Sequence, residues 1–329
     1  MSDVQIIEVS SSEDGIRLDK WFKLHFPEMG FGKLQKLMRT GQVRVDGGRV
    51  KPGTRLETGQ KVRVPPFSAT PTFSPPKPKT REVSEADAEQ IQQSVLHRDD
   101  DMIIINKPPG LAVQGGTGTS RHVDGMLDAL HFGAAERPKL VHRLDKDTSG
   151  VLVLARNSKA ARRLTELFRT REVRKLYWAL VVGVPTPEAG QIDLRLTKAP
   201  GRGGERMKVD EVNGKRAISR YQVLDNVGRT ASFLALEPLT GRTHQLRVHL
   251  AEALSTPVAG DGKYGGSDAY LEGGGLERKL HLHARRIRIP LTNGRSVEVS
   301  APIPEHFQMS LDYLGFHIEA DYDLFLALE

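Results

Sequence analysis

The residues best able to do chemistry lie in one short segment, residues 142–150, with the sequence HRLDKDTSG. The segment follows an apolar pair that suits the end of a strand and precedes an apolar run that begins at Val151. We therefore expect a loop exposed on a sheet. Within it, Asp145 lies two residues from Arg143 and next to Lys146. A carboxylate beside cations usually has a lowered pKa, so Asp145 is expected to be ionised and available as a nucleophile or an electrostatic stabiliser.

The second half of this segment, residues 147–150, has an ordinary structural explanation. Asp, Thr and Ser have short side chains that hydrogen-bond to nearby backbone, and glycine tolerates unusual backbone angles. By the same reasoning, a single aspartate in a loop is most often a turn or capping residue. Residue types and spacing alone therefore leave both interpretations of Asp145 open.

The elements that must position this loop are mainly strands. Apolar or alternating runs of strand length cover residues 103–105, 151–154, 176–182 and 231–236. Two helices are expected in the same region, over residues 158–168 with Ser158 as N-cap and over residues 243–254. Strands and helices without regular alternation indicate an α+β domain with a mixed, largely antiparallel sheet.

The N-terminal region, residues 1–66, is expected to form a small α/β module. The spacing of apolar residues predicts helices over 17–26 and 32–40, and strands over 43–45 and 61–64. The region carries 12 Lys+Arg and 8 Asp+Glu. This surplus suits a surface that meets a polyanion, although it also suits an ordinary solvated surface.

Two basic stripes run along the predicted helices of this module. Lys33, Lys36 and Arg39 are spaced three apart on the second helix, and the first helix has a similar set. Side chains at this spacing share one helix face. Each stripe is either a solvated face or a set of phosphate contacts.

A proline-rich segment divides the chain. Residues 65–81 contain six prolines and show neither helical nor strand periodicity, so an extended, semi-rigid tether is expected. The resulting division is a module (1–66), a linker (67–90), a large domain (91–305) and a C-terminal extension (306–329).

Composition narrows the class of protein. The 329 residues include 48 Lys+Arg against 41 Asp+Glu, a formal net charge of +7, and no cysteine. A basic surplus suits a nucleic-acid partner but also serves solubility. The lack of cysteine excludes disulfides, a cysteine nucleophile and thiolate zinc sites. The polar N-terminus is unlike a secretory signal, and no apolar run could span a bilayer, so a cytoplasmic protein is expected.

As a whole, the HRLDKDTSG segment resembles the signature of the RluA-type RNA pseudouridine synthases. Five further segments match motifs of that family in the same order: 106–110 (NKPPG), 174–181 (RKLYWALV), 240–249 (TGRTHQLRVH), 260–265 (GDGKYG) and 282–284 (LHA). The resemblance spans about residues 95–305, so the large domain is the expected catalytic domain. It implies an isomerase that converts uridine in RNA to pseudouridine.

This resemblance implies a role for each site residue. Asp145 matches the family's essential aspartate and is the expected nucleophile, acting at the anomeric carbon or through glycal formation. Tyr177 is expected to stack on the target base, and Arg247 to pair with Asp145. Arg143 is expected to help flip the base out of the RNA. The cleaved uracil is rejoined through carbon without outside electrons or groups, so no cofactor is expected.

Residues 15–65 resemble a second family, the αL RNA-binding module named for a small-subunit ribosomal protein. The match includes a turn of the type GQVRVDGG at residues 41–48. In that family, paired helices and the strands that follow grip structured RNA through its phosphates. The resemblance makes Lys33, Lys36, Arg39 and Arg44 the expected phosphate contacts.

Residues 112–118 (AVQGGTG) are most similar to the RluC branch of the larger family, which has AVHGGSG and modifies large-subunit ribosomal RNA. Gln114 replaces the histidine that is usual in that branch. The expected partner is therefore structured RNA, namely 23S ribosomal RNA, and the expected state is a monomer that binds neither a membrane nor a small-molecule cofactor.

Three alternatives follow from the same residues. The chain could be a non-catalytic RNA-binding factor for ribosome assembly on the same scaffold. It could also be a glycosidase-like hydrolase, but that chemistry needs a second carboxylate as general acid, and Asp147 is too close in sequence to be assumed. Histidine pairs at 244 and 249 and at 281 and 283 could suggest a metal, but without HExxH or cysteine no metal site is expected.

Overall fold

The computed structural model describes residues 4–66, 83–116, 119–199, 205–273, 276–316 and 325. Most of the predicted linker and two residues of the 112–118 segment lie outside this range. The chain divides into two units, Met1–Arg81 and Glu82–Glu329, which are described separately. Within the described residues, no helix has the length and apolarity needed to cross a lipid bilayer.

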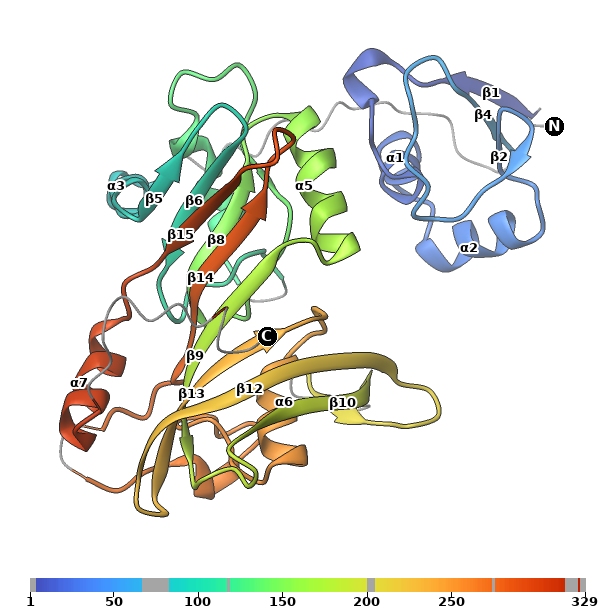
Figure 1. The fold of residues 1–329 in the computed structure, drawn as a ribbon. Coiled ribbons are helices and arrows are strands. Elements are labelled where there is room, and N and C mark those ends of the chain that lie inside the picture. The colour runs from blue at the N-terminus through green and yellow to red at the C-terminus, as the bar shows by residue number, and fades with distance from the viewer. Residues whose placement is uncertain are drawn as a thin grey trace. The chain divides into compact units, whose positions relative to one another are not determined.

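The N-terminal unit combines a four-stranded sheet with two helices (Figure 1). Its main elements are β1 (Gln5–Glu8), α1 (Leu18–His25), α2 (Phe31–Arg39), β2 (Arg44–Val45), β3 (Gly48–Arg49) and β4 (Lys61–Val64). The sheet order is β1-β4-β2-β3. Trp21 and Leu34 from the helices share one core with Val45 and Val62 from the sheet. Both predicted helices and both predicted strands are confirmed to within one residue at each end.

The second unit is built on an 11-stranded sheet. Its strands are β5 (Val95–Arg98), β6 (Met102–Lys107), β7 (Lys139–Leu140), β8 (Ser149–Ala155), β9 (Arg174–Val182), β10 (Ala189–Lys198), β11 (Met207–Val209), β12 (Lys215–Val227), β13 (Ala231–Pro238), β14 (Leu282–Pro290) and β15 (Ser296–Ser300). The main path is β11-β10-β12-β13-β9-β14-β8-β6-β5. Strands β14 and β8 pair in parallel, whereas the other strand pairs found in the described residues are antiparallel. The predicted α+β class with a mixed, largely antiparallel sheet is confirmed.

Helices cover both faces of this sheet (Figure 1). They are α3 (Glu85–Gln93), α4 (Val123–Met126), α5 (Ser158–Thr170), α6 (Gln245–Val248) and α7 (Glu305–Leu314). Along β6, Ile103 and Ile105 pack with Ile91 of α3, whereas Ile104 packs on the opposite face with Leu164 of α5. Because both faces are buried, β6 and β8 are continuous apolar runs rather than alternating ones.

The other half of the sheet is covered in the same way. On one face, Phe307 and Leu311 of α7 pack against Trp178 and Phe233. All but the first residue of this helix lie in the segment 306–329 that the sequence set apart, yet its apolar side chains belong to the core of the sheet. On the opposite face, α6 and the turn after it cover β9 and β13.

Two helix predictions were wrong in detail. The N-cap of α5 is Asn157, whose side chain accepts a hydrogen bond from the Ala160 amide at 2.8 Å, and Ser158 is the first helical residue. Residues 243–254 do not form one helix, because α6 has only four residues and continues as a π-helix, His249–Ala253. Leucines four residues apart predict a buried face in either helical form, so the pattern could not separate them.

Candidate active site

The loop that carries Asp145 connects β7 to β8 and ends where β8 meets β14. Leu144 is buried in the core beneath the sheet, and Thr148 is also buried. Ser149 shares a 2.8 Å hydrogen bond with Nδ1 of the buried His283. Buried neighbours on both sides therefore hold the Asp145 carboxylate in place, and its side chain is 17% exposed.

Gly150 is required by the packing of β8 against β14. It has φ +105°, a backbone angle that other residues rarely adopt. A Cβ at this position would overlap the carbonyl oxygen of Ala284. The strand begins at Ser149 rather than at Val151, so this glycine serves strand contact and not only the loop turn predicted from sequence.

Lys107, at the end of β6, holds the loop through a hydrogen bond to the backbone of Lys146. Its ammonium group is fully buried and donates to the carbonyl oxygens of Pro108 at 2.7 Å, Leu111 at 2.9 Å and Lys146 at 3.0 Å. Burial lowers the pKa of Lys107 to about 7, while Asp147 and Asp145 oppose that shift. Three carbonyl acceptors match the three N–H groups of the ammonium form.

We expect Lys107→Met to lower the free energy of unfolding by on the order of 2 kcal/mol, because three carbonyl groups lose their donor. Urea denaturation would measure the change. Lys146→Met is the matched control, since Lys146 is exposed and receives the bond through its backbone carbonyl. Equal stability of the two variants would contradict this account.

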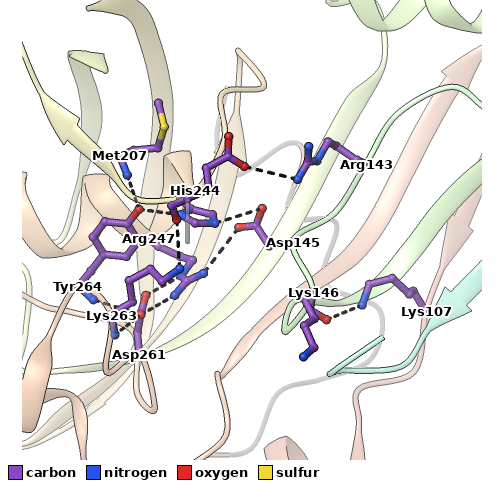
Figure 2. Close-up of polar contacts among 11 residues, drawn as sticks. Lys107, Arg143, Asp145, Lys146, Met207, His244, Arg247, Asp261, Lys263 and Tyr264 are labelled. Carbon is purple, nitrogen blue, oxygen red and sulfur yellow. Dashed lines mark hydrogen bonds and ion pairs between the residues drawn. The ribbon is translucent and has the colours of Figure 1, made fainter. Parts of the chain in front are cut away.

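Arg247 of α6 is the cation closest to Asp145, but Asp145 is not its hydrogen-bond partner. Its Nη1 lies 3.9 Å from Asp145 Oδ2. The same guanidinium donates to both oxygens of Asp261, from Nε at 2.7 Å and from Nη2 at 2.6 Å. The predicted pairing of Arg247 with Asp145 is therefore an electrostatic contact, and Asp261 holds the arginine (Figure 2).

The pKa of Asp145 shifts in the direction opposite to the one expected from sequence. Burial raises the pKa of Asp145, and the charges of Arg247 and Arg143 offset this only in part. The nearest Arg247 atom is 3.9 Å away, so the cation does not replace the hydrogen bonds that water would supply. The neighbouring cations in the sequence did not predict this direction, because the effect of burial on the pKa is larger than the effect of their charges.

Asp145 opens into a pocket of about 520 Å³. Tyr177 of β9, Arg247 and Leu282 line it together with Asp145, so the structure brings the three predicted catalytic residues to one cavity. Burial raises the pKa of Tyr177 above its usual value, which keeps the phenol neutral. Tyr177 also packs against two buried clusters, one that contains Leu144 and one that contains Leu246.

Arg143 lies in the wall of the same pocket but is largely exposed. Its side chain is 61% exposed and pairs at 3.8 Å with Glu205. An exposed pair at this distance contributes little stability. The arginine is therefore free to exchange Glu205 for a ligand group.

Three residues to which the sequence assigned no role complete the surroundings of Asp145, namely His244, Asp261 and Tyr264. His244 places Nε2 at 3.9 Å from Asp145 Oδ1, and its Nδ1 lies 2.6 Å from the Tyr264 hydroxyl. Tyr264 and Asp261 come from one turn, so the 260–265 segment supports both groups that face Asp145 (Figure 2). The motif was visible in the sequence, but no spacing rule connects residues 261 and 264 to residues 247 and 244.

The predicted RNA contacts of the N-terminal unit differ in their surroundings. Lys33, Lys36 and Arg39 are exposed along α2. Arg44 is half-buried and donates to the carbonyl oxygens of Gly41 and Gly47, so it also holds the turn after β2. In the parts of the chain that the structure covers, no three histidine, aspartate or glutamate side chains are grouped as metal ligands.

Comparisons with known proteins agree with this architecture. Residues 101–252 match the family model described as RNA pseudouridylate synthase. The chain is 34% identical to the Vibrio cholerae ribosomal large subunit pseudouridine synthase C, over 94% of this chain and 96% of that protein. It is 32% identical to the Arabidopsis thaliana mitochondrial RNA pseudouridine synthase 4, over 97% of this chain and 83% of that protein. The solved structure of human RNA pseudouridylate synthase domain containing 4 matches with TM-score 0.60 and 34% identity, over 70% of this chain and 96% of that chain.

Proposed function

This chain belongs to the RNA pseudouridine synthase family of isomerases, and we propose that it modifies uridines in 23S ribosomal RNA with Asp145 as its nucleophile. One observation carries the proposal. Asp145 lies in a 520 Å³ pocket with Tyr177 and Arg247, and neither of its two flanking donors is within hydrogen-bonding distance. A carboxylate in this setting is oriented, yet its oxygens remain available to react.

The chemistry assigned to these residues balances without a cofactor. A flipped uridine enters the pocket, where Tyr177 packs against its base. Asp145 acts on the sugar, directly at C1′ or by promoting glycal formation, and the C1′–N1 bond breaks with its electron pair on the uracil. The uracil turns and C5 bonds to C1′; in the direct route the Asp145–C1′ bond breaks in this step, and in the glycal route Asp145 returns the proton that it took from C2′. The C5 proton then leaves and N1 is protonated. Arg247 keeps the carboxylate oriented throughout.

The lining of the same pocket includes further cations, which suit the RNA backbone beside the flipped uridine. They are Arg171, Lys175 and Arg242, and they line the pocket together with Phe168. Burial lowers the pKa of Lys175 to about 8, Glu237 opposes this decrease, and the nearby Arg171 adds to it. An anion would relieve the repulsion between these cations, so we assign them to a phosphate of the bound strand.

The assignment to ribosomal RNA rests on the names of the relatives and has a direct test. Pseudouridines would be mapped in 23S RNA from cells that lack the protein, then from cells that regain either the unaltered chain or its Asp145→Asn variant. We expect specific uridines to lose modification and only the unaltered chain to restore it. If every site stays modified in the deletion strain, the ribosomal assignment is wrong.

The same experiment distinguishes the isomerase from a non-catalytic RNA-binding factor. A ribosome-assembly factor on this scaffold would rescue the deletion phenotype equally well with Asp145→Asn. A hydrolase would need a carboxylic acid beside Asp145, but Asp261 is bound on both oxygens by Arg247 and Asp147 is exposed. The isomerase proposal therefore accounts for these carboxylates better.

The exposed basic stripe on α2 leads to a prediction about how RNA binding depends on salt concentration. Replacing Lys33, Lys36 and Arg39 together with glutamine should weaken RNA binding and lower the slope of log Kd against log salt concentration by about 2–3, because fewer counterions are released. Binding titrations at several salt concentrations would measure it. Substitution of Lys51 and Lys61, exposed lysines of the same unit outside the stripe, is the charge control. Unchanged slopes would make the stripe a solvated helix face.

A further inference from the structure

His244 has a backbone conformation that residues other than glycine adopt only uncommonly. Its φ is +51° and its ψ is +21°, in the left-handed region. The turn lies directly before α6 and leaves the imidazole on the pocket wall, only 10% exposed. Strained backbone at the wall of a pocket is a common mark of a functional residue.

The contacts of Tyr264 favour one of the two neutral forms of the imidazole, the one with its hydrogen on Nε2. The Met207 amide can only donate, and it donates to the Tyr264 hydroxyl oxygen at 2.9 Å. The hydroxyl hydrogen then goes to His244 Nδ1 at 2.6 Å, the one acceptor found for it among the described residues. A neutral imidazole that accepts at Nδ1 carries its hydrogen on Nε2.

The surroundings also keep this histidine uncharged. Burial lowers the pKa of His244 to about 4, and the positive charges of Arg247 and Lys263 act in the same direction, against Glu205 and Asp261. The ring is therefore neutral at physiological pH. An imidazolium at this position would form an ion pair with Asp145 and occupy the nucleophile.

Nε2 faces the space where the substrate reacts. It lies 3.9 Å from Asp145 Oδ1, while Arg247 Nη1 lies 3.9 Å from Oδ2 of the same carboxylate (Figure 2). This separation is too long for a hydrogen bond, so the N–H group remains available to a ligand. The base is attached to the sugar carbon at which Asp145 acts, so a donor 3.9 Å from this carboxylate lies in the region that the base enters.

We propose that His244 is a further catalytic residue, which donates Nε2–H to a carbonyl oxygen of the flipped uracil, with Tyr264 as its positioning residue. The inference rests on the proposed function and deepens it. Cleavage leaves the C1′–N1 electron pair on the base, where it spreads to N1 and to the carbonyl oxygens. A donor placed there beforehand binds the anionic base more tightly than the neutral one and so lowers the barrier.

Substitutions separate this role from simple packing. We expect His244→Leu to reduce the single-turnover rate by about 10²-fold, the usual effect of losing one donor to a developing anion. His244→Gln keeps an N–H group near the Nε2 position and should recover part of the rate. Tyr264→Phe should lower it on the order of 10-fold, as expected when the partner that orients a histidine is lost. RNA affinity should stay within twofold of the unaltered chain.

Tyr221→Phe is the matched control for Tyr264→Phe. Tyr221 is buried and its hydroxyl donates to the carbonyl oxygen of Pro187 at 3.0 Å, but Tyr221 does not line the pocket. The control should leave the rate unchanged. Equal losses in Tyr221→Phe and Tyr264→Phe, or a His244→Leu rate equal to that of the unaltered chain, would overturn the proposal.

Sulfur substitution in the substrate tests the contact itself. The RNA is a fragment that contains one mapped uridine, carried as uridine, 2-thiouridine or 4-thiouridine, because a thiocarbonyl is a weaker acceptor. One analogue should slow the unaltered chain and slow His244→Leu no further, which identifies the oxygen that His244 contacts. If both analogues slow the two proteins by the same factor, His244 makes no such contact. If the unaltered chain fails on every uridine tested, the proposed function fails instead.

Discussion

Asp145→Asn is expected to reduce pseudouridine formation on the order of 10⁴-fold or more, the scale at which nucleophile substitutions act in enzymes with covalent or charge-based mechanisms. The amide has nearly the same shape as the carboxylate but carries no charge. It therefore loses both the nucleophile and the attraction of Arg247. Single-turnover measurements on the RNA fragment would detect this loss.

Asp147→Asn is the matched control for this variant. It makes the same chemical change two residues away, on an exposed side chain that does not line the pocket. We expect near-normal rates in the control, and normal RNA affinity and thermal stability in both proteins. Comparable rates for the two variants would remove Asp145 from the mechanism.

Arg247→Met should produce the second large effect, on stability and on activity together. Arg247 is 7% exposed and lies between the carboxylates of Asp261 and Asp145. Methionine would leave two buried carboxylates without their cation, which costs about 3–5 kcal/mol of unfolding free energy when one partner of a buried pair is removed. Denaturant unfolding measures this change.

The rate of the Arg247→Met variant should also depend on pH differently from that of the unaltered chain. The pKa of Asp145 is already raised by burial and lowered by Arg247, so removing Arg247 raises it further. Asp145 must be ionised to act, so the rate is lost as pH falls through this pKa. The acid limb of the pH–rate profile should therefore move to higher pH in Arg247→Met.

A double variant separates the two effects of Arg247. Adding Asp261→Asn removes one of the stranded charges, so Arg247→Met/Asp261→Asn should regain part of the lost stability. It should not regain activity, because Asp145 still lacks its cation. Recovery of both would mean that Arg247 acts only as a structural partner of Asp261.

The sequence alone was sufficient for the class of fold, for both helices and two of the four strands of the N-terminal unit, and for three residues that line the pocket. The pattern of apolar residues along a sequence indicates which residues are buried. Both faces of β6 and β8 are buried, so their continuous apolar runs could be recognised as strands from the sequence. The reaction came from the whole HRLDKDTSG segment and its companion motifs. Spacing alone left Asp145 undecided between a turn residue and a nucleophile.

The partners of the site residues depended on tertiary structure. Arg247 donates both hydrogen bonds to Asp261 and none to Asp145, and His244 lies 2.6 Å from the Tyr264 hydroxyl. Both contacts depend on how the long connection between β13 and β14 folds back on itself. The predicted direction of the pKa shift of Asp145 was wrong because it, too, depends on tertiary structure. Neighbouring charges can be counted along the chain, but burial depends on what the folded chain packs over the carboxylate.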